Sequence, residues 1–154
     1  MAMSNYLENK LIDHLFRGVS FSAPTTLYIA LLTTAAVDSD TGTTISSGGG
    51  TGVEVSSSGT NYSRVQLNPS TTNWANTQQS GTGVSSGSGG TTSNSVVVTF
   101  PTATGSWGTV TGIAIVDAST NGNIHFYGTL GTNKTVGTDD ILQFTANQIS
   151  VALS

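Results

Sequence analysis

The hydrophobic residues of the first segment, residues 4–18, recur at helical spacing. Five apolar residues form this pattern: Leu7, Leu11, Ile12, Leu15 and Phe16. The spacing places all five on one side of a helix. Asn5 and Glu8 have the spacing of a capping box, Ser4 is an alternative cap, and Gly18 suits a left-handed helix end. The pattern therefore predicts an amphipathic helix over residues 4–18.

After this helix the apolar residues follow the pattern of β-strands. Thr26–Thr33 is an apolar run rich in strand-forming residues, and Tyr62–Leu67 alternates between apolar and polar positions. Five more segments have strand character: Ser95–Phe100, Val110–Val116, Asn123–Tyr127, Ile141–Thr145 and Ile149–Leu153. Thr120–Asn123 carries an Asn-Gly pair, which is a strong hairpin signal. Closely spaced strands without helices between them predict a mainly β fold, an antiparallel β-sandwich or barrel of about seven strands.

Two segments have few of the apolar residues that a core requires. Residues 35–59 are mostly Gly, Ser, Thr and Asp, which predicts a long loop with room for one short strand. Residues 80–95 consist almost entirely of Gly, Ser and Thr and predict a flexible loop. Trp74 lies between these segments and is expected to pack into the core. The length of 154 residues suits a single domain, residues 1–154, with these loops inside it.

The charge content excludes some classes of partner. Only 8% of the residues are charged, against about 25% in an ordinary soluble domain. The four Lys and Arg residues are scattered and the net charge is −4, so we expect no nucleic-acid partner. The apolar runs are far shorter than a membrane span, and the chain starts without a secretory signal pattern. We therefore expect no membrane partner and synthesis in a cytoplasm.

Patterns that could support catalysis or metal binding are weak. Gly83–Gly87 has the spacing of a nucleophile elbow, but it lies in a Gly/Ser tract and not between a strand and a helix. Asp38 and Asp40 resemble the start of a calcium loop whose later Gly and Glu positions do not match. His14 and His125 have no ligand-type residue at metal-binding spacing, and the chain has no Cys. We predict no enzyme activity, no metal and no cofactor.

Six residues are candidates for docking a partner. The apolar side of the predicted helix either packs on its own domain, which is the usual case, or docks against a neighbour. Trp107 lies between two glycines, and it is either a core residue or a surface aromatic. The candidate docking residues are Leu7, Leu11, Ile12, Leu15, Phe16 and Trp107.

Several stretches resemble a family of small virion proteins of tailed bacteriophages. They are Asn5–Gly18 leading into Ala23–Thr33, then Thr99–Asp117, and Gly122–Gly128 followed by a turn that begins at Lys134. A Gly-Tyr-x-Arg element of that family is present as Asn61-Tyr62-Ser63-Arg64, with Asn in place of Gly. The Gly/Ser loops lie outside the resemblance.

The resemblance implies a structural protein of the virion, made in the cytoplasm of the bacterial host. Members of the family are called head-decoration or tail-fibre proteins. The chain has no heptads or repeats, which favours a capsid decoration or cement protein. It would form a homo-oligomer, a trimer by expectation, on the major capsid protein or other virion proteins. The alternative is a tail-fibre or receptor-binding module whose loops, residues 41–59 and 80–95, contact host glycan.

Overall fold

The protein is mainly β and antiparallel, as predicted. A computed structural model describes residues 1–79 and 81–153. In these residues the elements follow the order β1 (Ala2–Met3), α1 (Asn5–Phe16), β2 (Tyr28–Thr34), α2 (Gly42–Ser47), β3 (Val53–Glu54), β4 (Val65–Gln66), β5 (Thr91–Ser93), β6 (Val98–Thr99), β7 (Gly108–Val116), β8 (Ile124–Val136), β9 (Gln143–Phe144) and β10 (Ser150–Ala152).

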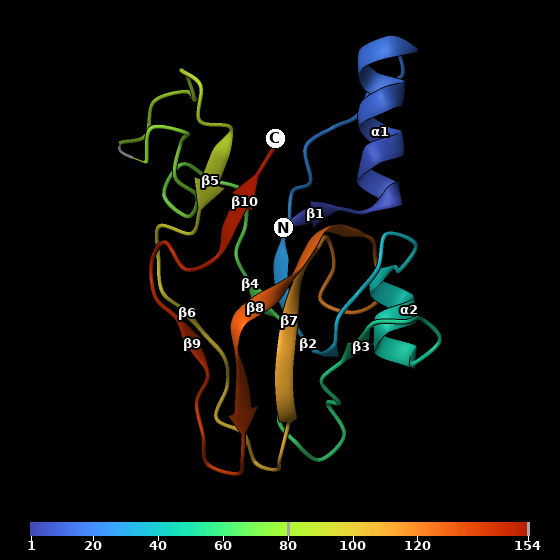
Figure 1. Cartoon of the computed structure of the whole chain (residues 1–154), viewed down its shortest axis with the longest axis vertical. Coiled ribbons are helices and arrows are strands. Elements are labelled where there is room, and N and C mark those ends of the chain that lie inside the picture. Colours follow the sequence, from blue (N-terminus) through green and yellow to red (C-terminus); the bar gives the residue numbers. More distant parts are fainter. Residues whose placement is uncertain (80, 154) are drawn as a thin grey trace.

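The largest sheet has six strands in the order β1-β8-β7-β2-β3, and β4 also pairs with β2 (Figure 1). A long hairpin of β7 and β8 forms its centre, with Ile115 opposite Phe126. The predicted hairpin turn is confirmed between these strands. Asn121 and Gly122 both have positive φ angles, 55° and 78°, which are the backbone angles that favour Asn-Gly in such turns.

Strand β2 and the second half of β7 are buried on both faces of the sheet. In β2, Ile29 and Leu31 point into the larger core cluster, whereas Ala30 and Leu32 belong to a second cluster on the opposite face. All four are 0% exposed. This arrangement explains why β2 and β7 are continuous apolar runs, because a strand with one wet face would alternate. The larger cluster includes residues of the two-stranded ribbons β6–β9 and β5–β10, which form a layer against the main sheet.

Helix α2 covers the other face, and it corrects the prediction of a loop over residues 35–59. Thr41 caps the helix in a capping box with Thr44, and Gly48 ends it with a φ of 72°. Ile45 is its single buried apolar side chain, 1% exposed. The short strand expected in the same segment is present as β3.

The loop predicted over residues 80–95 is also partly wrong, because β5 lies inside it and pairs with β10. Ser80 lies outside the described residues. Other strands are shorter than their sequence patterns: Tyr62–Leu67 contains only the two residues of β4 in a strand. The described residues form ten strands, more than the predicted seven, and the second layer consists of ribbons instead of one continuous sheet.

A candidate interaction surface beside the N-terminal helix

The start of α1 is held firmly against the main sheet. Strand β1 pairs with β8 just before the helix, and the backbone N–H of Ser4 donates to the carbonyl of His125 at 3.1 Å. Ser4 is fully buried, and its hydroxyl accepts from the N–H of Leu7 at 3.4 Å and donates to the carbonyl of Ile124. Ser4 is therefore the helix cap, which was the alternative to the Asn5–Glu8 box.

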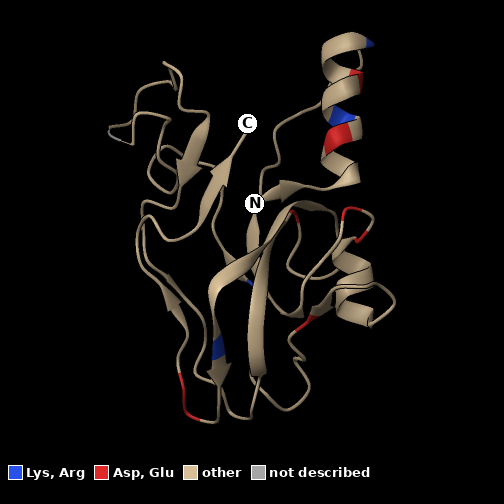
Figure 2. Ribbon diagram, viewed as in Figure 1, with Lys and Arg blue, Asp and Glu red and all other residues tan. Residues whose placement is uncertain are grey.

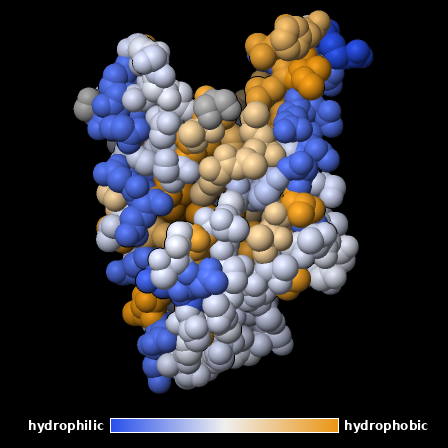
Figure 3. Space-filling view, in the orientation of Figure 1, coloured by the Kyte–Doolittle hydropathy of each residue, from blue (hydrophilic) through white to orange (hydrophobic). Residues whose placement is uncertain are grey.

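The far end of α1 leaves the body of the protein. Of its five apolar residues only Leu7 is buried, at 6% exposed. Ile12, Leu15 and Phe16 are 51%, 68% and 81% exposed. We call these three residues the apolar ridge. In Figure 3 the helix stands out from the body with hydrophobic side chains near its end. The expectation that this side of the helix packs on its own domain is therefore wrong for the ridge.

The geometry of the helix explains why the ridge is uncovered. Successive residues turn by about 100°, so the apolar positions from Leu7 round to Phe16 span roughly 180° of the helix circumference. A single packing contact normally uses an apolar stripe of about 100°. Leu7 and Leu11 lie on the side of α1 that faces the body. The three ridge residues lie outside that contact.

An apolar cleft lies next to the ridge. It has a volume of about 730 Å³ and lies between α1 and the β5–β10 ribbon. Leu7 and Leu11 line it on the helix side, Phe126 contributes from β8, and Trp74 and Leu153 contribute from the opposite side. Figure 3 shows this hollow as a hydrophobic area between two raised parts of the molecule. Trp74 also packs against the larger core cluster, in agreement with the sequence.

The walls of the cleft are formed by apolar and uncharged polar residues and by two histidines, His14 and His125. Among the described residues that line it, none is Asp, Glu, Lys or Arg. The whole stretch between Arg64 and Asp117 lacks such residues, and it includes β5 on the ribbon side of the cleft. Figure 2 shows that α1 itself is charged, with residues of both signs. Asp13 and Arg17 form an exposed i,i+4 pair at 2.8 Å.

His125 supports the base of α1. Its side chain is buried beneath the ring of Tyr6, at 5.4 Å between ring centroids, and that of Phe21, at 6.5 Å. His14 accepts the backbone N–H of Phe21 at 3.3 Å. Both histidines therefore have structural roles at the connection between α1 and β2.

Burial lowers the pKa of His125, and the nearby carboxylate of Asp117 offsets only part of this effect. The Nε2 atom lies 3.6 Å from Oδ2 of Asp117 and has no hydrogen-bond partner among the described residues. For Asp117, burial opposes ionisation, but hydrogen bonds from Asn123 and the attraction of His125 outweigh burial and lower its pKa.

Trp107 does not belong to this surface. It is 4% exposed, and its indole N–H donates to the carbonyl of Thr60 at 2.9 Å. Its ring packs edge-on against Tyr62 and Phe100. Trp107 is therefore a core residue that offers no surface to a partner, which corrects its inclusion among the docking candidates.

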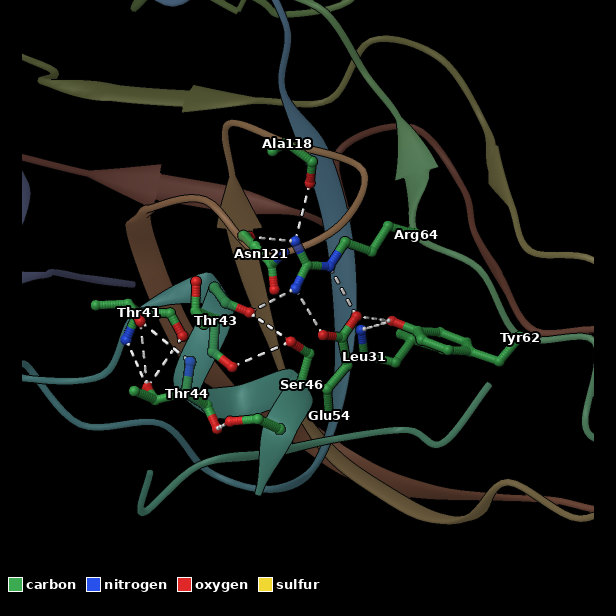
Figure 4. A network of polar contacts seen from close by, with 12 residues as sticks. Leu31, Thr41, Thr43, Thr44, Ser46, Glu54, Tyr62, Arg64, Ala118 and Asn121 are labelled. Carbon is green, nitrogen blue, oxygen red and sulfur yellow. Dashed lines mark hydrogen bonds and ion pairs between the residues drawn. The ribbon is translucent and has the colours of Figure 1, made fainter. Parts of the chain in front are cut away.

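The Tyr-x-Arg element forms a buried polar network that the sequence did not reveal (Figure 4). Arg64 makes a two-pronged contact with Glu54, Nε to Oε1 at 2.8 Å and Nη2 to Oε2 at 2.7 Å. Its remaining N–H groups donate to the carbonyls of Ala118, Asn121 and Gly42 at 2.8–2.9 Å. One guanidinium thus joins β3, the β7–β8 turn and the start of α2, and it uses all five of its donors.

Tyr62 completes this network. Its hydroxyl donates to Oε1 of Glu54 at 2.9 Å and accepts the N–H of Leu31 at 2.8 Å. Burial, together with the charge of Glu54, holds the pKa of Tyr62 well above its usual value. Asn61, which stands where the resembling family has Gly, has a φ of 56°. Asn is among the residues that tolerate this left-handed conformation best after Gly.

The described residues contain neither a group of metal ligands nor a membrane-spanning helix. Within residues 1–79 and 81–153, no three His, Asp or Glu side chains gather as a metal site would require. In the same residues, no helix has the length and apolar character needed to cross a membrane.

Comparison with known proteins decides the family. A family model described as podophage GP4 fiber I protein gp80 matches residues 2–152. The chain belongs to this family. No curated protein matches the chain significantly. The fiber I family is a structural one, so the protein is a fibre component of a phage virion and is not an enzyme. The resemblance to phage virion proteins is confirmed, and the fibre description favours the tail-fibre alternative over capsid decoration.

Proposed function

We propose that this fiber I protein is a tail-fibre subunit that joins a neighbouring virion protein through the apolar ridge and the cleft. The observation that carries the proposal is the exposure of Ile12, Leu15 and Phe16 beside an uncharged, apolar hollow. Large apolar side chains that lie together on a surface mark a contact with another molecule, because leaving them in water costs about 25 cal/mol per Å².

The fibre position replaces the capsid-decoration reading that the sequence favoured. That reading depended on the absence of heptads and repeats, which excludes a coiled-coil shaft and leaves other fibre modules open. The family description supports a fibre. Contact between the Gly/Ser loops and host glycan stays a prediction. Residues 41–59 and 80–95 contain no Phe, Trp or Tyr, Trp107 is buried, and Trp74 lines the cleft.

Incorporation into particles tests this proposal, and the chain offers a closely matched control. Ile12 on the ridge is 51% exposed, and Ile141, in the segment between β8 and β9, is 54% exposed. In Figure 1 that segment lies at the opposite end of the molecule from α1. Phages that carry Ile12→Ser or Ile141→Ser would be purified, and the copies of the protein per particle would be measured by quantitative mass spectrometry.

We expect Ile12→Ser to lower the copy number severalfold and Ile141→Ser to leave it unchanged. Both variants replace an isoleucine of similar exposure by serine, so a general effect of a more polar surface would be the same in both. Equal incorporation of the two variants would contradict the proposal.

A further inference from the structure

We infer that the neighbour in the cleft is a second copy of this chain, with the apolar ridge of each copy lying in the cleft of the other. This twofold pair differs from the trimer expected from the sequence. This inference rests on the proposed function and names the partner of the same surface. The inference has two requirements. The chain must carry two complementary apolar surfaces, and these surfaces must be unable to pack against each other within one chain.

The ridge and the cleft meet the first requirement. The ridge is convex and apolar, and the cleft is concave and apolar. A twofold interface uses the same patch on both subunits, so that patch must contain the two complementary parts. Because the ridge and the cleft adjoin, one twofold axis between two copies can bring both pairs together and bury each ridge once.

The helix geometry meets the second requirement. Leu7 and Leu11 of α1 already line the home cleft, whereas Ile12 and Phe16 are not among its lining residues. A rigid helix that presents Leu7 and Leu11 to the cleft turns Ile12 and Phe16 away from it. The ridge therefore reaches a cleft only in another molecule.

The distribution of charge favours a second copy of the chain over a partner that binds through ion pairs. The cleft walls offer no Asp, Glu, Lys or Arg within the described residues, so a partner that recognises by ion pairs finds nothing there to pair with. The ridge supplies uncharged apolar side chains, and the adjacent Asp13 and Arg17 neutralise each other as a pair at 2.8 Å. Two copies thus meet without placing like charges opposite one another in the cleft, despite a net charge of −4 on each.

The size of the cleft suits this occupant. Its volume of about 730 Å³ corresponds to roughly two dozen water molecules, which apolar walls hydrate poorly. A reciprocal contact, with one ridge in each of two clefts, doubles the apolar surface buried. Doubling matters because stable interfaces bury about 800 Å² on each partner.

The first test is the mass of the intact chain in solution across a range of concentrations, measured by sedimentation equilibrium. We expect a dimer whose dissociation constant rises at least tenfold with Phe16→Ser and is unchanged with Ile141→Ser. A chain that stays monomeric up to the highest concentration would overturn the inference, as would a monomer found with a bound apolar small molecule.

The second test locates the contact by disulfide trapping, for which the chain has a clean background because it contains no Cys. Phe16→Cys marks the ridge and Leu153→Cys marks the rim of the cleft, where Leu153 is 58% exposed. Each variant carries one thiol, so a bond formed with diamide as the oxidant joins two chains. Mixing Phe16→Cys with Ile141→Cys is the control.

We expect the Phe16→Cys and Leu153→Cys mixture to form the crossed disulfide faster than the control mixture. Trapping only between two Phe16→Cys chains would mean that ridges pack on ridges, which contradicts the reciprocal arrangement. The failures of the two proposals are distinguishable. If the chain is monomeric and the Ile12→Ser variant is not incorporated, only the inference of a second copy fails. If the chain is dimeric and the variant is incorporated normally, the proposed role in assembly fails.

Discussion

Two arginines show how burial determines the contribution of an ion pair to stability. Arg64 and Arg17 each contact a carboxylate at almost the same distance, 2.7 Å to Glu54 and 2.8 Å to Asp13. The side chains of the first pair are 2% and 6% exposed, and those of the second are 68% and 41% exposed. Exposed pairs contribute little because water and salt screen them, whereas breaking a buried pair leaves a charge without a partner.

Replacement of each arginine by alanine tests this difference. We expect Arg64→Ala to lower the free energy of unfolding by about 3–5 kcal/mol, because buried Glu54 loses its ion-pair partner and three carbonyl groups lose the hydrogen bonds from Arg64. We expect Arg17→Ala to lower it by less than about 1 kcal/mol. Urea denaturation followed by circular dichroism measures both. Similar losses for the two variants would refute a structural role for the Arg64 network.

A second prediction at this scale concerns His125 and pH. Burial lowers its pKa in the folded protein, so between that value and the ordinary histidine value of about 6.5 the unfolded chain binds the proton more readily. Stability should therefore fall as the pH drops below about 6.5. Asp117, whose pKa is lowered, contributes in a separate window below about pH 4.

Thermal unfolding between pH 7.5 and pH 5 measures this effect. We expect the Tm of the wild type to fall across this range, and His125→Gln, which has no titrating ring, to show a smaller fall. An equal pH dependence in the two proteins would show that another group is responsible.

At the scale of elements, the sequence predicted the helix and the strands whose apolar pattern lies within a single short segment. Helix α1 has a periodic apolar side and a closing Gly18, and β2 and β7 have continuous apolar runs. Helix α2 escaped prediction because one buried Ile45 gives no periodicity, and its capping Thr41 resembles the residues of the surrounding loop. The sequence also could not show how much of α1 is covered, because coverage depends on distant segments.

The position of α2 depends on a close backbone contact that a substitution can test. A Cβ atom at Gly42 would lie 2.0 Å from the carbonyl oxygen of Asn121, and the carbonyl of Gly42 accepts from Arg64. We expect Gly42→Ala to destabilise the protein by about 1–3 kcal/mol, although Ala is the better helix former. Gly131→Ala is the control, because a Cβ there meets nothing within 4 Å. Chemical denaturation that ranks the two variants equally would contradict this packing.

At the scale of the whole molecule, the sequence established the class of protein and left its place in the particle open. The resemblance in α1, β2 and the β7–β8 hairpin identified a phage virion protein, which the family match confirms. The choice between capsid and fibre could not be predicted, because low charge and absent repeats suit both. The Tyr-x-Arg element carried part of the resemblance, yet only the folded structure shows that Arg64 joins three segments distant in sequence.

The most direct measurement of the central claim is a cryo-electron microscopy map of the intact phage at a resolution that shows side chains. We predict that this protein lies in a tail fibre and that Ile12, Leu15 and Phe16 are covered by a neighbouring subunit. Density for the protein spread over the capsid, or a fibre in which the apolar ridge faces solvent, would contradict the account.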